Sequence, residues 1–266
     1  MSPGVGRVRM PGGCPGRAVG NLADRASGTA GPGFEGAGPG KPPRMDTPAN
    51  MLLIRPPGVY RPQGDTELLV SCVRRERLDG DSRVLDLCTG TGAVALAAAH
   101  EGARVTAVDL SARAVATAWL NARLHRSGIR LRRGDLLAPV TAGTFDLITA
   151  NPPYVPAART RRGHGRGLAW DAGPDGRLVL DRICREAPPR LARGGVLLVV
   201  QSSLADVPAT LAALGAAGLR TAVTARRRQA FGPVMTARAA LFERLGLISP
   251  GDRWEILVVV RGVRER

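Results

Sequence analysis

Arg83-Val84-Leu85-Asp86-Leu87-Cys88-Thr89-Gly90-Thr91-Gly92 is the stretch that decides the fold of this 266-residue chain. Its first five residues are mostly apolar and predict a buried strand, and the five that follow predict a tight glycine turn. The Ala-rich run 93–100 then predicts a helix. Gly90 and Gly92 accept backbone angles that other residues avoid, and they let a ligand approach the main chain. A strand, a glycine turn and a helix in this order favour an α/β fold, although a lone Gly-x-Gly pair is a weak signal.

Two further predicted strands end in an acidic residue. The strand 103–108 runs into Asp109, which lies about where a nucleotide-binding sheet holds the hydroxyl pair of a ribose. The strand 129–133 leads into Gly134-Asp135-Leu136, where the carboxylate could accept a bond from an adenine amino group. Because the carboxyl ends of parallel strands open into one crevice, we expect the glycine turn and both acids to line one site.

The next predicted strand, 145–150, ends in Asn151-Pro152-Pro153-Tyr154. The Asn151 side-chain oxygen and the Pro152 carbonyl can each accept a bond from one N–H of a planar amino group, and Tyr154 can stack on its flat face. The two prolines fix the loop, so the acceptors are in place before a substrate arrives. Such a grip turns a delocalised nitrogen lone pair toward an electrophile, which predicts methylation of a conjugated amino nitrogen. The alternative is an ordinary proline-rich turn after a buried strand.

Together these motifs resemble the S-adenosylmethionine-dependent methyltransferases of the HemK/PrmC group, whose members methylate the glutamine amide of the Gly-Gly-Gln motif in peptide chain release factors. Val59-Tyr60-Arg61-Pro62-Gln63-Gly64-Asp65-Thr66 is similar to the Tyr-x-Pro-x-Glu-Asp-Thr segment of the short branch, which lacks the helical N-terminal domain. Trp170-Asp171-Ala172-Gly173-Pro174-Asp175-Gly176 is similar to the Gly-Gly-x-Asp-Gly segment that follows the catalytic loop. The resemblance covers roughly residues 59–260, and Gly64 stands where the short branch usually has Glu.

The resemblance implies a Rossmann-like, seven-stranded class I methyltransferase sheet, mostly parallel with the last strand antiparallel and with helices on both faces. It implies S-adenosylmethionine as the cofactor and no metal. The implied catalytic residues are Asn151, Pro152, Pro153 and Tyr154, and the same four with Asp65 and Thr66 would bind the substrate. The residues implied in cofactor binding are Asp86, Leu87, Cys88, Thr89, Gly90, Thr91, Gly92, Asp109, Leu110, Asp135, Leu136 and Asn151.

The rest of the chain predicts the second half of the sheet. Apolar periodicity and the Gly and Pro breaks predict helices over 177–187, 204–217 and 237–245, and strands over 196–200, 220–227 and 255–260. Asp175 favours an N-cap for the helix that follows it. Trp119, on the second predicted helix, is expected in the core.

Composition divides the chain at about residue 50. Residues 1–50 are rich in Gly and Pro and predict a disordered N-terminal extension, and residues 51–266 predict the methyltransferase domain. Met45 and Met51 lie close to where the ordered pattern begins, so an over-long reading of the gene is the alternative. No apolar run suits a signal peptide or a membrane anchor, which favours a cytoplasmic enzyme. The cysteines at 14, 72, 88 and 184 form no CxxC pair, and three of them lie in apolar segments typical of core thiols.

The charge of the chain is strongly positive, with a net value of +16 that arginine supplies almost alone. A basic surface beside an active site favours a nucleic-acid contact, because neutralising phosphates gives affinity without sequence preference. The predicted RNA contact is the cluster just after the catalytic loop, which consists of Arg159, Arg161, Arg162 and Arg166. The alternative is a solvated surface with a compositional bias toward arginine.

Three functions remain open from the sequence. The first is methylation of the glutamine amide of a release factor or another translation-associated protein. The second is methylation of an exocyclic amino group of adenine or guanine in RNA or DNA, which uses the same loop on an unstacked base. The third is a catalytically inactive, cofactor-binding assembly factor, against which the intact Asn-Pro-Pro-Tyr motif argues. Short-branch members can also need a small zinc-binding partner subunit, so such a partner is a further expectation.

Overall fold

The computed structural model describes residues 51–157 and 170–265. The predicted N-terminal extension, residues 1–50, lies outside the described residues. The same holds for Arg159, Arg161, Arg162 and Arg166, so the predicted RNA contact at this cluster stays a prediction.

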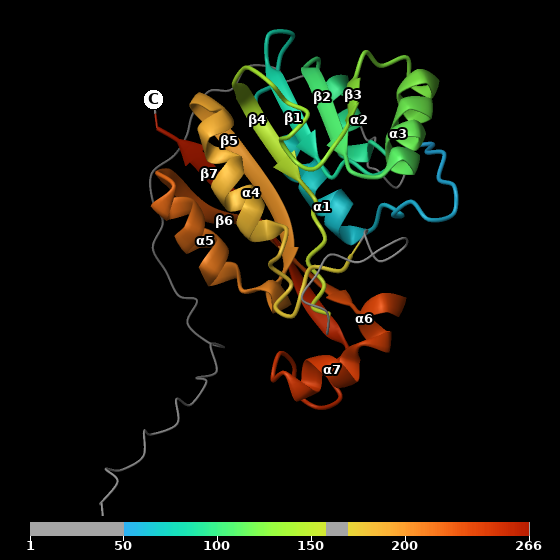
Figure 1. Cartoon of the computed structure of the whole chain (residues 1–266), viewed down its shortest axis with the longest axis vertical. Helices are drawn as coiled ribbons and strands as arrows, with labels where there is room; N and C mark the ends of the chain where they lie inside the picture. Colours follow the sequence, from blue (N-terminus) through green and yellow to red (C-terminus); the bar gives the residue numbers. More distant parts are fainter. Residues whose placement is uncertain (1–50, 158–169, 266) are drawn as a thin grey trace, which may run out of the picture. The chain divides into compact units, whose positions relative to one another are not determined.

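Seven strands form one sheet in the order β3-β2-β1-β4-β5-β7-β6 (Figure 1). The first five in this order are parallel to one another, and β7 runs antiparallel to both of its neighbours. The predicted mostly parallel sheet with an antiparallel last strand is therefore confirmed. The strands are β1 (Arg83–Leu87), β2 (Arg104–Asp109), β3 (Arg130–Arg133), β4 (Phe145–Ala150), β5 (Leu191–Ser202), β6 (Leu219–Ala230) and β7 (Trp254–Arg264).

Helices cover both faces of the sheet, because the central strands are apolar on both sides. In β5, Leu197 and Val199 belong to one core while Leu198 and Val200 belong to the other, as the two-residue period of a strand requires. The first core includes side chains of α4 (Leu180–Glu186) and α5 (Val207–Ala216), and the second includes those of α1 (Gly64–Val73) and α2 (Ala93–His100). The helix α3 (Ala112–Leu124) lies beside α2 and contacts β2 and β3.

The prediction for Trp119 is wrong, because this side chain is 49% exposed. The buried face of α3 carries the small residues Ala114, Ala118 and Ala122, which allow the helix to approach its neighbours closely. Larger residues of α3 are therefore left on the outer face, where the guanidinium of Arg123 lies 5.2 Å from the centre of the Trp119 ring.

The predicted helix over 204–217 is divided in two. A 3-10 turn, η3 (Ser203–Ala205), precedes α5 because Asp206 adopts a left-handed conformation with φ 50°. The Asp206 carboxylate then accepts a bond from the Ala209 amide at 3.0 Å and caps α5.

The predicted cap at Asp175 serves a turn instead of a helix. Its carboxylate accepts from the Arg177 amide at 2.9 Å, whereas α4 begins at Leu180. A short 3-10 helix, η2 (Pro188–Arg190), follows α4 and leads into β5.

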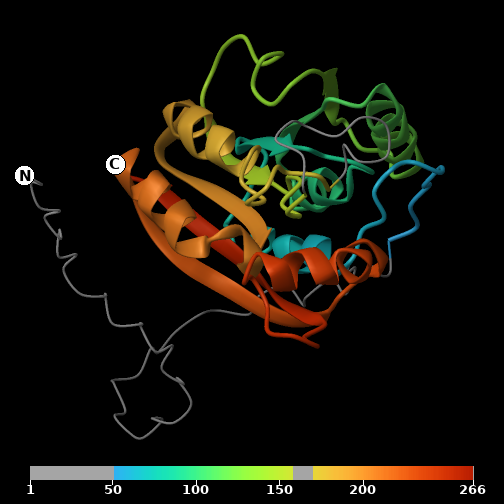
Figure 2. The ribbon, with the colours of Figure 1, turned by 60° about the horizontal axis from the view of Figure 1, so that its bottom comes forward.

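Two short helices, α6 (Pro233–Ala237) and α7 (Ala239–Arg244), connect β6 to β7 (Figures 1 and 2). They replace the single helix predicted over 237–245. Arg238, between them, donates to the Pro156 carbonyl at 3.2 Å and forms an ion pair with Asp171. This connection therefore contacts the chain on both sides of the gap after the Asn-Pro-Pro-Tyr loop. Within the described residues, no helix is both long and apolar enough to cross a membrane.

Candidate active site

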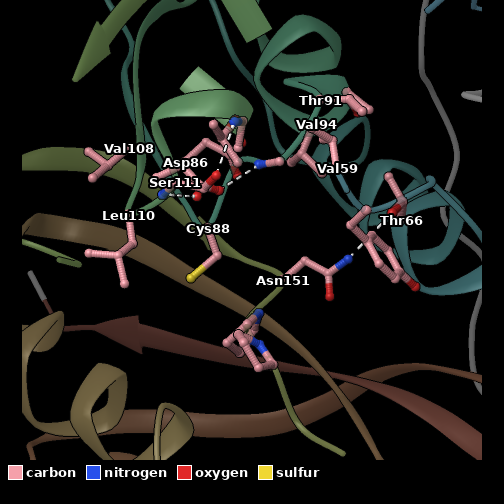
Figure 3. Close-up of a pocket in the computed structure, with 18 of the residues that line it drawn as sticks. Val59, Thr66, Asp86, Cys88, Thr91, Val94, Val108, Leu110, Ser111 and Asn151 are labelled. Carbon is pink, nitrogen blue, oxygen red and sulfur yellow. Dashed lines mark hydrogen bonds between the residues drawn. The ribbon is translucent and has the colours of Figure 1, made fainter. Parts of the chain in front are cut away.

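A pocket opens at the carboxyl ends of β1, β2 and β4, where the predicted motifs converge (Figure 3). Of the predicted site residues, those that line it are Asp65, Thr66, Asp86, Cys88, Thr89, Gly90, Thr91, Asp109, Leu110, Leu136, Asn151, Pro152, Pro153 and Tyr154. Leu87, Gly92 and Asp135 do not line it. Three predicted site segments far apart in the sequence, 65–66, 86–92 and 151–154, thus meet around one cavity.

The glycine turn between β1 and α2 forms one wall of the pocket. Cys88, Gly90 and Gly92 all have positive φ, at 57°, 56° and 82°. At Gly90 an added Cβ would meet no atom within 4 Å, whereas at Gly92 it would lie 3.2 Å from the Cβ of Ala118. Gly90 therefore leaves the backbone open toward a ligand, and Gly92 lets α3 approach the turn closely.

The buried carboxyl group of Asp86 stabilises this turn by hydrogen bonds. It accepts a bond from the hydroxyl of Thr89 at 2.6 Å and another from Thr149 on β4 at 2.7 Å. Burial raises the pKa of Asp86 to about 6, and the two hydroxyl donors oppose that rise. Its role in the structure is to join the turn to the neighbouring strand.

Asp109, at the end of β2, is held by two backbone amides. One oxygen accepts from the Gly90 amide and the other from the Ser111 amide, both at 2.9 Å (Figure 3). These bonds fix the carboxylate at the rim of the pocket, and a carboxylate oxygen can accept from more than one donor. The position suits the predicted ribose contact, which stays a prediction.

Asp135 is turned toward α4. Its carboxylate forms an ion pair with Arg182 at 2.7 Å, and its neighbours Gly134 and Leu136 line the pocket in its place. The left-handed conformation of Leu136, φ 48°, accompanies this turn of the chain. The predicted bond from an adenine amino group to Asp135 therefore requires this ion pair to rearrange or be shared.

The amide of Asn151 is oriented by a chain of hydrogen bonds. The Thr66 hydroxyl donates to Asp65 at 3.1 Å, so it is free to accept from the Nδ2 of Asn151, which lies at 3.3 Å (Figure 3). Because the Nδ2 of Asn151 is bound to Thr66, the Oδ1 of the same amide points away from Thr66. The orientation is compatible with the predicted acceptor role of this oxygen toward a substrate N–H, which stays a prediction.

The buried carboxylate of Asp65 joins Tyr60, Thr66 and Tyr154 by hydrogen bonds. An oxygen of Asp65 accepts from the hydroxyl of Tyr60 at 2.7 Å and from that of Tyr154 at 3.0 Å. The other oxygen accepts from the amide and the hydroxyl of Thr66. With four donors in place, Asp65 positions its neighbours and has little capacity left for a substrate. Burial raises the pKa of both tyrosines, and the Asp65 carboxylate adds to the rise, so both hydroxyls remain donors.

Gly176 explains how the segment after the catalytic loop supports it. The Val155 amide donates to the Trp170 carbonyl at 3.0 Å, which lays residues 170–176 against the loop. A Cβ on Gly176 would lie 2.4 Å from the Tyr154 carbonyl oxygen, and its φ is 75°. Only glycine meets both conditions, which gives a physical reason for the Asp-Gly of this segment.

Tyr60 and Glu255 are two of the residues near Asp65 that were not predicted as site residues. Tyr60 could have been included, since it lies in the segment that resembles the short branch. Glu255, at the start of β7, is 190 positions from Asp65 and carries no local signal. It is only 3% exposed, and its Oε2 has no hydrogen-bond partner among the described residues. Burial raises the pKa of Glu255 to about 7, and the Asp65 carboxylate adds to the rise.

Two other predictions concern thiols and metals. Cys72 and Cys184 are buried, as expected for core thiols, whereas Cys88 is half-buried and lines the pocket. Across residues 51–157 and 170–265, no group of His, Cys, Asp and Glu has the arrangement of a metal site.

The sequence matches a family model and several known proteins. Residues 51–217 match the family model of the methyltransferase small domain. A putative protein N5-glutamine methyltransferase of Methanocaldococcus jannaschii is 36% identical over 186 residues, which cover 69% of this chain and 92% of that protein. A release factor glutamine methyltransferase of Deinococcus radiodurans is 38% identical over 70% of this chain and 67% of its own length. Several other release factor glutamine methyltransferases are matched over only about half of their length.

A solved structure is also similar to this chain. The complex of Mtq2 with Trm112 from E. cuniculi, described as responsible for the methylation of the eRF1 translation termination factor, contains a chain similar to this one. The TM-score is 0.55 with 26% identity, over 78% of this chain and 99% of that chain. The match to the family model extends over more than half of the sequence and includes the glycine turn, both acidic strand ends and the Asn-Pro-Pro-Tyr loop. The chain therefore belongs to the methyltransferase small domain family, in its HemK/PrmC-type group.

Proposed function

We propose that this enzyme transfers a methyl group from S-adenosylmethionine to the side-chain amide of a glutamine in a peptide chain release factor or another translation-associated protein. The observation that carries the proposal is the orientation of Asn151, whose nitrogen is held by Thr66 and whose oxygen is left to accept. A carboxamide NH₂ presents two in-plane N–H donors, which the Asn151 oxygen and the Pro152 carbonyl can receive together. A translation-associated substrate would place the enzyme in the cytoplasm.

The chemistry of the pocket wall fits the proposed cofactor. Backbone amides of the glycine turn at the start of α2 suit its carboxylate, and the carboxylate of Asp109 suits its ribose hydroxyls. The apolar side chains of Leu110, Val108 and Leu136 line the pocket on the side where an adenine ring would lie. When bound, the cofactor supplies a methyl group on a sulfonium, which is activated without help from the protein.

The contribution of the protein is to position the acceptor nitrogen. Asn151 and Pro152 hold its two protons, so its lone pair turns out of conjugation and toward the methyl group. The ring of Tyr154 is fixed by its bond to Asp65 and can pack against the plane of the amide. Asp65 already accepts four bonds, so it is poorly placed to act as a base, and the proton can leave after the methyl group has arrived.

The direct test is transfer of radiolabelled methyl from S-adenosylmethionine to three acceptors in parallel: a release factor, its Gly-Gly-Ala variant and total RNA. We expect label on the factor and none on the variant. The enzyme variant Asn151→Ala should abolish transfer while leaving cofactor affinity, measured by calorimetry, within about threefold, because the amide acts on the acceptor. Label on RNA alone would show that the acceptor is a nucleobase amine and would overturn the proposal.

We extend the proposal to a small partner subunit, because the similar E. cuniculi methyltransferase was solved together with Trm112. The purified chain should then transfer methyl slowly alone and faster when co-expressed with a small zinc-binding protein of this kind. Full activity of the chain alone would remove the partner from the proposal and leave the glutamine acceptor untouched.

A further inference from the structure

A second cavity lies at the opposite ends of the strands that form the active site. It has a volume of about 640 Å³, and it is lined by residues at the starts of β1, β2 and β3 and at the ends of α2 and α3. The active-site pocket opens where β1 and β2 end, so the two sites are separated by the length of the sheet. We call this second cavity the arginine groove.

The lining of the arginine groove is cationic. Its charged side chains are all basic, and neither Asp nor Glu contributes to the lining as the structure describes it. Its two histidines, His100 and His125, have ring centres 5.6 Å apart. The five arginines are Arg83, Arg104, Arg126, Arg130 and Arg132.

Two of these arginines contact other side chains of the fold, and the other three form no ion pair in the described part of the chain. Arg104 is paired with Asp81 at 2.7 Å, and Arg83 lies over the ring of Phe145. Arg126, Arg130 and Arg132 are exposed, and none of the three forms an ion pair with another residue in the described ranges.

The backbone brings the three unpaired arginines to one rim. Arg130 and Arg132 lie on β3, two residues apart, so both side chains project from the same face of that strand. Arg126 follows the end of α3 in a left-handed conformation, φ 52°. Arg126 can be explained by its place near the end of a helix, where a basic side chain interacts favourably with the helix carbonyls. That explanation does not apply to Arg130 and Arg132, which lie on a strand.

We propose that the arginine groove binds the phosphate backbone of RNA. Guanidinium groups bind phosphate oxygens in pairs and are more weakly hydrated than ammonium groups, so an arginine-lined cavity without carboxylates suits a polyanion. A folded protein partner fits less well, because the one aromatic side chain of the lining that could anchor it, Phe145, is only 5% exposed. The net charge of +16 adds a long-range attraction to the same ligand.

This inference goes beyond the proposed function and does not depend on it. Because the groove and the active site lie at opposite ends of the sheet, RNA and an acceptor protein could be bound together. An enzyme acting on translation factors would then be retained near RNA-containing particles while its active site stays open.

The test measures the anisotropy of a fluorescein-labelled single-stranded RNA of about 20 nucleotides with the full chain, over a range of salt concentrations. The triple variant Arg126→Gln, Arg130→Gln, Arg132→Gln removes three phosphate contacts, so the negative slope of log K against log salt should become less steep by about 2. Between about 50 and 200 mM salt the wild type should then lose about twentyfold more affinity than the triple variant loses. The midpoint of thermal unfolding of this variant should stay near that of the wild type.

The matched control removes the same charge elsewhere, with Arg220→Gln, Arg226→Gln and Arg244→Gln at three exposed positions outside both cavities. We expect its slope to change by less than about 0.5, as for a purely long-range effect. The proposal that the groove binds RNA would be overturned if the two triple variants lost equal RNA affinity. It would also be overturned if the wild type bound no RNA. A loss confined to a variant of Arg159, Arg161, Arg162 and Arg166 would overturn it as well and would place the RNA contact after the catalytic loop.

Discussion

Replacing Gly176 by Ala is the sharpest test of how the catalytic loop is supported. The new Cβ would lie 2.4 Å from the carbonyl oxygen of Tyr154, which is backbone and cannot rotate away. The Cβ of Ala205 and the Cδ of Pro156, both at 3.3 Å, close the other directions. The left-handed φ of 75° adds about 1–2 kcal/mol for a residue with a side chain.

The size of the kinetic effect follows from the displacement. To restore a separation of 3.0 Å, the Tyr154 peptide must shift by about 0.6 Å relative to Gly176, and ordinary van der Waals contact requires about 1 Å. A misplacement of about 1 Å in a positioning group can lower a rate by about a hundredfold. We therefore expect the methyl-transfer rate constant kcat of Gly176→Ala to fall by roughly 10- to 100-fold, with cofactor affinity little changed, because the glycine turn is not touched.

The control separates strain from displacement. Gly218 also has a left-handed conformation, φ 81°, but an added Cβ there meets no atom within 4 Å. Gly218→Ala should therefore lower the free energy of unfolding by about 1 kcal/mol through strain alone and leave kcat unchanged. Both variants would be compared by thermal unfolding and by methyl transfer at saturating cofactor. A Gly176→Ala enzyme with the kcat of the wild type would refute the claim that this glycine positions the loop.

Three further predictions concern single groups around the pocket. Thr66→Val removes the acceptor that holds the Nδ2 of Asn151, so kcat should fall by about tenfold or more while calorimetry finds unchanged cofactor affinity; a normal kcat would contradict the orientation argument. Asp109→Ala should weaken cofactor binding by about tenfold or more, and an unchanged dissociation constant would remove the ribose assignment. Glu255 has a folded pKa of about 7, above the usual 4.5, so its neutral form is favoured on folding and wild-type stability should fall as pH rises from about 4.5 through 7. Glu255→Gln should remove that slope, worth up to about 3 kcal/mol at pH 8, whereas Glu101→Gln, at an exposed site, should leave the slope in place.

The parts of this molecule that the sequence predicted are those with local causes. Strand β1, the glycine turn and helix α2 follow from a short apolar run, two glycines and an alanine-rich segment. Four strand ends could be assigned to one edge because parallel strands share a direction, and the pocket does contain Asp109 and Asn151. The hydrogen-bonding groups of each motif could be predicted without knowing which segments lie beside it in the fold.

The parts that were missed depend on contacts between distant segments. Trp119 is large and apolar, but small residues on the other face of α3 decide which side is buried. Asp135 was assigned to the pocket because of its strand end, whereas its pairing with Arg182 is set by the packing of α4. Glu255 is brought near Asp65 by the pairing of β7 with β5, which joins segments far apart in the sequence. No pattern within a single segment predicts that pairing.

The departure at Gly64 acquires a physical meaning from the same kind of distant contact. The resembling short branch usually has Glu there, so this chain lacks a carboxylate at that position. A Cβ on Gly64 would lie 2.0 Å from the side-chain oxygen of Gln229 on β6, so the space is already occupied by a neutral amide. On the same strand, Arg227 pairs with Glu67 of α1 at 2.6 Å and fixes the strand against the helix. A side chain at position 64 would therefore require the end of the flexible Gln229 side chain to move, whereas no backbone atom stands in its way.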